Sequence, residues 1–109
     1  MFNPVIIIPC YNHADAFQRF SQKIADNNIP VIVIDDGGKE TQSKLLRKTC
    51  LANGFIYIRN DKNGGKGRAM HIGFNLARAM GFTHGLQIDA DGQHDANIAR
   101  SEERRVGKE

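Results

Sequence analysis

The sequence contains no tryptophan, only two cysteines and only three prolines among its 109 residues. Cys10 and Cys50 are far apart and form no CxxC pair, which favours a reduced, cytoplasmic protein over a disulfide-stapled one. The longest aliphatic runs, residues 5–8 and 31–34, are far shorter than the roughly 20 residues that span a membrane. Residues 1–4 lack the basic start of a secretory signal. We therefore expect neither a membrane span nor a leader in this sequence.

Charge of one sign is not concentrated anywhere in the chain. The formal net charge is +3, and the basic residues are scattered rather than clustered. Nucleic-acid-binding domains usually carry a basic patch or stripe, so we expect no nucleic-acid partner. With 40% hydrophobic and 25% charged residues, the composition is ordinary for one soluble domain.

Short apolar segments alternate with longer amphipathic ones. Residues 5–8, 31–34, 55–58 and 85–88 have the pattern of short buried strands. Helical patterns run between them, from Asn12 to about Asn28, from about Thr41 to a stop at Gly54, and from a glycine-rich turn to about Met80. Strands that alternate with helices of this length indicate βαβ units, so the fold class is predicted as α/β with a mostly parallel sheet.

Local signals give further expectations about the helices. Asn12 is of a type that caps helix N-termini, and we expect it to cap the first helix. Aromatic and methionine side chains recur at helical spacing and are predicted to be core residues: Phe17, Phe20, Met70, Phe74 and Met80.

The strongest chemical signal is the segment Asp89-Ala90-Asp91-Gly92-Gln93-His94-Asp95. Two carboxylates arrive one residue apart where the expected strand at 85–88 ends. Ligands of open α/β sheets bind beyond the carboxyl ends of the strands. Mg²⁺ takes one or two carboxylates together with substrate phosphates. The segment therefore predicts a divalent-metal site, with an ordinary Asp-Gly turn as the alternative.

Three other strand ends carry polar or glycine-rich segments, at residues 9–12, 35–38 and 63–67. Successive parallel strands end on the same side of a sheet, so we expect all four segments along one edge. Together they supply what a nucleotide-sugar site needs: a ring or carboxylate beside the base and ribose, close backbone approach near the phosphates, and a metal between the phosphates.

The four segments resemble the motifs of a large family of inverting glycosyltransferases that includes dolichyl-phosphate mannose synthases. The matching stretches are Ile7-Ile8-Pro9-Cys10-Tyr11-Asn12, Val33-Ile34-Asp35-Asp36-Gly37, Asn63-Gly64-Gly65-Lys66-Gly67 and Leu86-Gln87-Ile88-Asp89-Ala90-Asp91-Gly92-Gln93-His94. Residues 1–99 resemble the N-terminal, nucleotide-sugar-binding half of such a domain. The resemblance implies the GT-A fold, a Rossmann-like, mostly parallel α/β sheet with flanking helices, here cut after about four strands.

The resemblance also implies roles for residues on the donor side. Pro9 and Tyr11 would border the nucleobase, Asp36 would accept a hydrogen bond from it, and Asp89 would face the ribose and the metal. Lys66, in the glycine-rich turn, could neutralise phosphate charge. The structural alternatives are a helix cap for Asp36 and an ordinary surface position for Lys66.

A metal site and a reaction follow from the same resemblance. Asp91 would ligate Mg²⁺ or Mn²⁺ directly, with Asp89 and Gln93 as further ligands. The enzyme would transfer a sugar, with inversion, from a nucleoside-diphosphate sugar to a hydroxyl or lipid phosphate, the acceptor being a polyprenyl phosphate, lipid or polysaccharide. Its general base would lie in the second half of the domain, and its location would be cytoplasmic, at a membrane face. His13 replaces a glutamate that many relatives carry, so it receives no role.

Two other functions fit parts of the pattern. Haloacid-dehalogenase-type phosphatases also place Asp-x-Asp-Gly after a strand, but they follow the glycine with threonine and use the first strand, whereas Gln93 follows Gly92 here. A P-loop is excluded because Gly67 follows Lys66 where serine or threonine is required. A non-catalytic nucleotide-binding module remains the alternative from a different class.

The last ten residues break the α/β pattern. Arg100-Ser101-Glu102-Glu103-Arg104-Arg105-Val106-Gly107-Lys108-Glu109 matches the in-frame translation of AGATCGGAAGAGCGTCGTGTAGGGAAAGAG, a common short-read sequencing adapter. We therefore expect residues 100–109 to be a non-native tail, outside the fold reasoning. We also expect this tail to pack against nothing, because it was never selected to fit the core.

Overall fold

The computed structural model describes residues 1–90 and the backbone of residues 102–105. Its elements follow the chain as β1 (Pro4–Cys10), α1 (Ala14–Ala25), β2 (Val31–Asp35), α2 (Glu40–Asn53), β3 (Ile56–Arg59), α3 (Gly65–Ala79), β4 (His84–Gln87) and β5 (Glu102–Arg105). The predicted α/β class and the alternation of strands and helices are confirmed.

The described strands form one sheet in the order β3-β2-β1-β4-β5. Strands β1 to β4 pair in parallel, whereas β5 runs antiparallel to β4. The chain adds β2 and β3 on one side of β1 and then crosses to the other side to form β4. The strand order therefore reverses between β1 and β4. In open α/β sheets a reversal of this kind opens a ligand-binding crevice beyond the strand ends.

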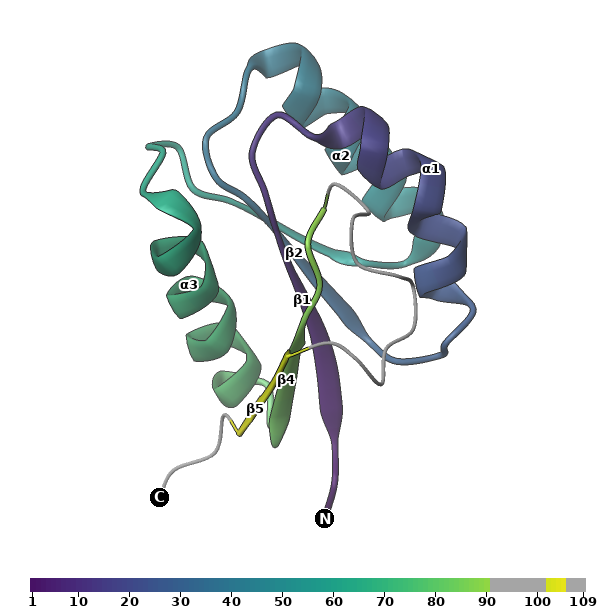
Figure 1. Ribbon diagram of the computed structural model, residues 1–109, viewed down its shortest axis with the longest axis vertical. Coiled ribbons are helices and arrows are strands. Elements are labelled where there is room, and N and C mark those ends of the chain that lie inside the picture. The colour runs from purple at the N-terminus through teal and green to yellow at the C-terminus, as the bar shows by residue number, and fades with distance from the viewer. Residues whose placement is uncertain (91–101, 106–109) are drawn as a thin grey trace.

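Helices cover both faces of the sheet, with α1 and α2 on one side and α3 on the other (Figure 1). Alternate residues of β1 point to the two layers, so Ile6 and Ile8 join a core cluster with Phe17 of α1. Val5 and Ile7 join a second cluster under α3. These four side chains of β1 are 0% exposed, as expected for a parallel strand that is covered on both faces.

The predicted core positions on the helices are confirmed, with one exception. Phe17 is 0% and Met70 is 4% exposed, while Phe20 and Phe74 are partly buried against the two clusters. Met80 was expected in the core but is 47% exposed. Helix α3 ends at Ala79, so Met80 is the residue after its last turn and leaves the buried stripe.

The helix N-termini are capped by side chains from other segments. The expectation that Asn12 caps α1 is wrong, because Asn12 has a φ of 58° rather than the extended backbone of an N-cap residue. Its Oδ1 instead accepts a hydrogen bond from the backbone N–H of Lys39, the N-cap residue of α2, at 2.8 Å. In return, Oε1 of Gln42 in α2 accepts from the N–H of Ala14 at 2.9 Å. The two helices thus cap each other.

Strand β5 corrects the expectation that residues 100–109 pack against nothing. Its backbone pairs with β4 over the register from His84 and Arg105 to Gln87 and Glu102. A sheet edge presents N–H and C=O groups that any extended segment can bond. The pairing therefore needs no particular side chains, which is why the sequence pattern did not predict it.

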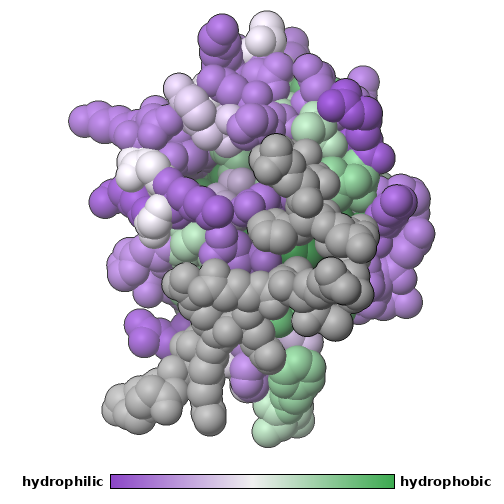
Figure 2. All heavy atoms as spheres, in the orientation of Figure 1, coloured by the Kyte–Doolittle hydropathy of each residue, from purple (hydrophilic) through white to green (hydrophobic). Residues whose placement is uncertain are grey.

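Polar residues cover most of the described surface that is visible in Figure 2. Large hydrophobic side chains that are nevertheless exposed include Met1, Phe2 and Leu51. Within the described residues, no helix combines the length and the apolar character needed to cross a membrane.

Helix α3 approaches β1 closely at Gly73. A Cβ built at Gly73 would lie 2.5 Å from Cγ2 of the fully buried Ile7, whereas a Cβ at Gly67 in the same helix would meet no described atom within 4 Å. We expect Gly73→Ala to lower the free energy of unfolding by about 1–3 kcal/mol through overpacking. Gly67→Ala should instead raise it by about 0.5–1 kcal/mol, as expected for alanine in open helix. Urea unfolding of both variants is the measurement, and equal effects of the two would contradict the close approach.

Both cysteines are buried free thiols in the cluster beneath α1 and α2. Burial raises the pKa of Cys10 to about 11 and that of Cys50 to about 12, from an ordinary value of 9.0. Each folded thiol holds its proton more tightly than the unfolded one. Its contribution to stability is therefore complete below pH 9.0 and is lost as the pH rises through 11 to 12. Between pH 9 and 12, urea unfolding should show a smaller loss of unfolding free energy for Cys50→Ala than for the wild type. Identical losses would disprove the raised pKa of the Cys50 thiol.

Candidate functional site

A pocket of about 230 Å³ opens beyond the carboxyl ends of β1 and β4. This is the point where the strand order reverses. Its lining consists of Pro9, Cys10, Tyr11, His13, Asp36, Lys66, Ala69, Asp89 and Ala90. The structure thus brings together all five residues that the sequence predicted on the donor side: Pro9, Tyr11, Asp36, Lys66 and Asp89.

The strand register explains why residues from distant segments meet here. Cys10 at the end of β1 pairs with Asp35 of β2, and Asp35 pairs with Arg59 of β3, so these three strands end at one level. Strand β4 runs beside β1 on the other side and delivers Asp89 to the pocket next to Pro9. The expected common edge is therefore present.

Asp36 leaves the end of β2 and caps helix α3. Its Oδ1 accepts hydrogen bonds from Nδ2 of Asn60 and from the N–H of Gly64, both at 3.1 Å, and its Oδ2 accepts from the N–H of Gly65 at 2.8 Å. The alternative in which Asp36 caps the helix after its own strand is wrong, since Lys39 is the N-cap residue of α2. A carboxylate at the start of α3 also interacts favourably with the helix dipole.

Gly37 allows Asp36 to reach the loop that follows β3. It has a φ of 77°, and a Cβ there would lie 2.9 Å from the backbone N of Asn63 and 3.0 Å from the carbonyl O of Asn60. Only glycine adopts this backbone freely and leaves this space open. The segments after β2 and β3 therefore touch through their backbones, which brings the α3 N-terminus within hydrogen-bonding distance of Asp36.

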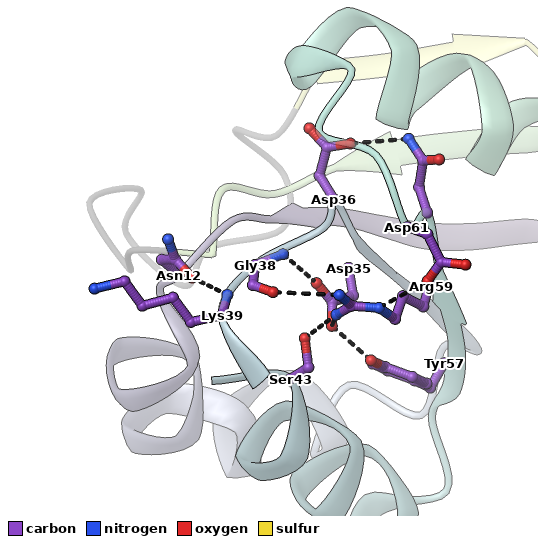
Figure 3. A network of polar contacts seen from close by, with 10 residues as sticks. Asn12, Asp35, Asp36, Gly38, Lys39, Ser43, Tyr57, Arg59 and Asp61 are labelled. Carbon is purple, nitrogen blue, oxygen red and sulfur yellow. Dashed lines mark hydrogen bonds and ion pairs between the residues drawn. The ribbon is translucent and has the colours of Figure 1, made fainter. Parts of the chain in front are cut away.

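Asp35, the last residue of β2, accepts hydrogen bonds on the other side of this strand end (Figure 3). It is 2% exposed and accepts hydrogen bonds from the hydroxyl of Tyr57 at 2.5 Å, from Nη1 of Arg59 at 3.3 Å and from the N–H of Gly38 at 3.3 Å. Arg59 also donates to the hydroxyl of Ser43 and to the carbonyl of Gly38. Burial and the hydrogen bond to Asp35 raise the pKa of Tyr57 to about 12, so Tyr57 stays a donor at neutral pH.

The sequence did not lead to the roles of Asp35, Tyr57 and Arg59. A weak signal was present, because Tyr57 and Arg59 are two residues apart on one strand and therefore share a face. Arg59 also donates a hydrogen bond to Asp61 at 3.0 Å, which raises the pKa of its guanidinium. What the sequence lacked was the register that sets Arg59 against Asp35.

Lys66 and Asp89 form an ion pair in the pocket. Nζ of Lys66, in the first turn of α3, lies 2.8 Å from Oδ1 of Asp89, just beyond β4, and the two side chains are 56% and 27% exposed. Ion pairs this exposed contribute little to stability, about 0–1 kcal/mol. The ion pair of Lys66 and Asp89 matters here because it places a cation and a carboxylate side by side in the pocket. His13, to which the sequence assigned no role, also lines the pocket.

The expected metal site lies only partly within the described residues. Asp89 lines the pocket and supplies carboxylate oxygens, which are ligands that Mg²⁺ and Mn²⁺ accept. The other expected ligands, Asp91 and Gln93, lie outside the described residues. In the described part of the chain, no group of three or more His, Cys, Asp and Glu side chains could hold a metal ion.

Known proteins are similar to this chain in sequence and in fold. An uncharacterised protein of Methanocaldococcus jannaschii is 30% identical over 94 residues, which are 83% of this chain and 41% of that protein. The UDP-N-acetylglucosamine–dolichyl-phosphate N-acetylglucosaminyltransferase of Methanococcus voltae is 27% identical over 103 residues, covering 82% of this chain and 41% of that enzyme. The chain thus spans about two-fifths of the length of these curated relatives.

Solved structures confirm the predicted GT-A fold. A mannosyltransferase of Pyrobaculum calidifontis in complex with GDP-Man and Mn²⁺ superposes with a TM-score of 0.70 at 18% identity, over 82% of this chain and 27% of that one. The family model described as glycosyl transferase family 2 matches residues 5–99. This match leaves the phosphatase alternative without support. The chain belongs to glycosyl transferase family 2, as its motifs indicated.

Proposed function

We propose that the chain binds a nucleoside-diphosphate sugar in the pocket between the ends of β1 and β4, as the donor side of a glycosyltransferase. The observation that carries this proposal is the convergence of Lys66, Asp36 and Asp89 on one pocket beside the aromatic ring of Tyr11. A diphosphate requires a cation, whereas bases and riboses present N–H and O–H groups that carboxylates accept. The pocket offers both kinds of partner.

The charges suggest how the donor lies. A diphosphate is repelled by the carboxylate of Asp36 and attracted by Lys66, so its phosphates belong on the Lys66 side. That arrangement leaves Asp36 for the base, with Pro9 and the 45% exposed Tyr11 at its border. Asp89 then faces the ribose and the metal. The amides of Gly64 and Gly65 donate to Asp36, so the phosphate interaction rests on Lys66 rather than on these two amides.

We propose Mg²⁺ or Mn²⁺ as the cofactor, held by Asp89 together with Asp91 and Gln93. The carboxylate of Asp89 fits such an ion, and the mannosyltransferase of Pyrobaculum calidifontis was solved with Mn²⁺ and GDP-Man. A bound divalent ion supplies a Lewis acid for the departing diphosphate. In the free protein Lys66 provides a positive charge at Asp89.

The proposed reaction is transfer of the sugar with inversion to a hydroxyl or lipid phosphate. A hydroxyl acceptor must be deprotonated by a general base, whereas a lipid phosphate is already anionic at neutral pH. We place this base in the second half of the domain, beyond this chain. A polyprenyl phosphate is the acceptor we favour, because the Methanococcus voltae relative is named for dolichyl phosphate. We place the reaction at the cytoplasmic face of a membrane.

The role of Lys66 can be tested by nucleotide binding. Lys66→Met keeps the aliphatic stem but removes the cation, so we expect the Kd for UDP and GDP to rise about tenfold, the equivalent of roughly 1.4 kcal/mol. The measurement is isothermal titration calorimetry with Mg²⁺ present. Lys44→Met, an equally conservative change at an exposed position of α2, is the control and should leave the Kd unaltered. Equal affinities of Lys66→Met and the wild type would remove Lys66 from the phosphate site.

The metal ligands can be tested without turnover. Asp89→Asn and Asp91→Asn each remove a carboxylate charge, so we expect Mn²⁺ affinity in the presence of UDP to fall by at least about tenfold. Electron paramagnetic resonance of free Mn²⁺ measures this affinity directly. Asp15→Asn, on the exposed part of α1, serves as the matched control. Undiminished Mn²⁺ binding by both site variants would exclude the proposed metal site.

A further inference from the structure

We propose that this pocket selects uridine diphosphate donors over guanosine diphosphate donors, because the donors to Asp36 in the described part of the chain leave its carboxylate one open acceptor position. The inference rests on the proposed function, in which Asp36 faces the base. The similar proteins do not determine which nucleobase the donor carries, since one relative is named for a UDP-sugar and a structural neighbour was solved with GDP-Man.

The capacity of the Asp36 carboxylate can be counted. A carboxylate offers two oxygens with about four acceptor positions in all. Within the described residues, Oδ1 already accepts from Asn60 and Gly64, and Oδ2 accepts from Gly65. The donors of the described residues thus leave one acceptor position, on Oδ2. Asp36 is 3% exposed and lines the pocket, so a base bound in the pocket is the partner that we assign to this position.

The four common bases differ in what they present to such an acceptor. Uracil has a single N–H, at N3, between two carbonyl groups, and so it matches one open position. Guanine presents the N1–H and the 2-amino group side by side, and one of these donors would remain buried without an acceptor, which weakens binding. Adenine and cytosine place a ring-nitrogen lone pair beside their amino group, where it meets the negative charge of the carboxylate. Uracil is therefore the base that fits.

Asn60 is the specificity-determining side chain in this arrangement. It supplies the one side-chain donor to Asp36 among the described residues, whereas Gly64 and Gly65 donate through their backbones. The backbone N–H of Asn60 donates to the carbonyl O of Asp35 at 2.7 Å, which anchors the loop independently of its side chain. Removing the Asn60 amide therefore reopens a second acceptor position, on Oδ1.

A ligand series on the unaltered protein tests the inference. Calorimetry with UDP, GDP and inosine diphosphate, each with Mg²⁺, should give a Kd for UDP at least about tenfold lower than that for GDP. Inosine diphosphate differs from GDP only by lacking the 2-amino group, so it should bind more tightly than GDP. Equal binding of the two purine nucleotides would overturn the acceptor count as the cause of selection, and GDP binding as tightly as UDP would overturn the selection itself. Either result would leave the proposed nucleotide site intact. Absence of binding by all three would instead refute the proposed function, and this inference with it.

A variant tests the same acceptor count from the side of the protein. Asn60→Ala should narrow the ratio of the GDP and UDP dissociation constants by several-fold, because guanine then finds its second acceptor. The control is Asn75→Ala, which removes the same amide group from an exposed position more than two turns after the start of α3. It should leave the ratio of the two dissociation constants unchanged. Circular dichroism establishes that each variant is folded. A folded Asn60→Ala protein that keeps the wild-type ratio would disprove the role of Asn60, and the ligand series decides the matter if the variant does not fold.

Discussion

The carboxylate of Asp36 joins the end of β2 to the loop and the helix start that follow β3, 24 to 29 residues further along the chain, and the pocket depends on it. It links the end of β2 to the loop after β3 through Asn60 and to the N-terminus of α3 through the amides of Gly64 and Gly65. Helix α3 connects β3 to β4, which lie on opposite sides of β1 in the sheet. Because Asp36 caps the first turn of α3, Lys66 in that turn lies close enough to Asp89 to form an ion pair.

The two adjacent aspartates divide the work because successive residues of a strand face opposite sides of the sheet. Asp35 faces the α1 and α2 layer, where Arg59 and Tyr57 satisfy its buried charge. Asp36 faces α3 and the pocket. One carboxylate therefore stabilises the framework, while its neighbour serves both as a helix cap and as part of the candidate site.

The pocket combines a rigid wall with a pair of charges that can separate. The ends of β1 and β2 are buried and hydrogen-bonded, so Asp36 is presented in one position. The ion pair of Lys66 and Asp89 is partly exposed, so little free energy is needed to separate the two side chains. In the proposed function they separate, and Lys66 then binds the diphosphate while Asp89 binds the metal ion. In the proposed function, base recognition thus belongs to the rigid part of the site and phosphate recognition to the adaptable part.

The sequence by itself determined strands β1 to β4, helices α1 to α3 and five of the residues that line the pocket. Those features are local: the apolar runs of β1 and β2 define buried strands, and polar segments at strand ends of a parallel sheet must share one edge. The four motifs also led to the family. The tertiary structure alone decided which partners these residues take. Asn12 caps α2 rather than α1, Asp36 caps α3, and Arg59 pairs with Asp35, because strand order and register bring together residues that no local pattern connects. The reversal of strand order between β1 and β4, and the pairing of β5 through backbone groups common to all residues, are likewise properties of the assembled sheet.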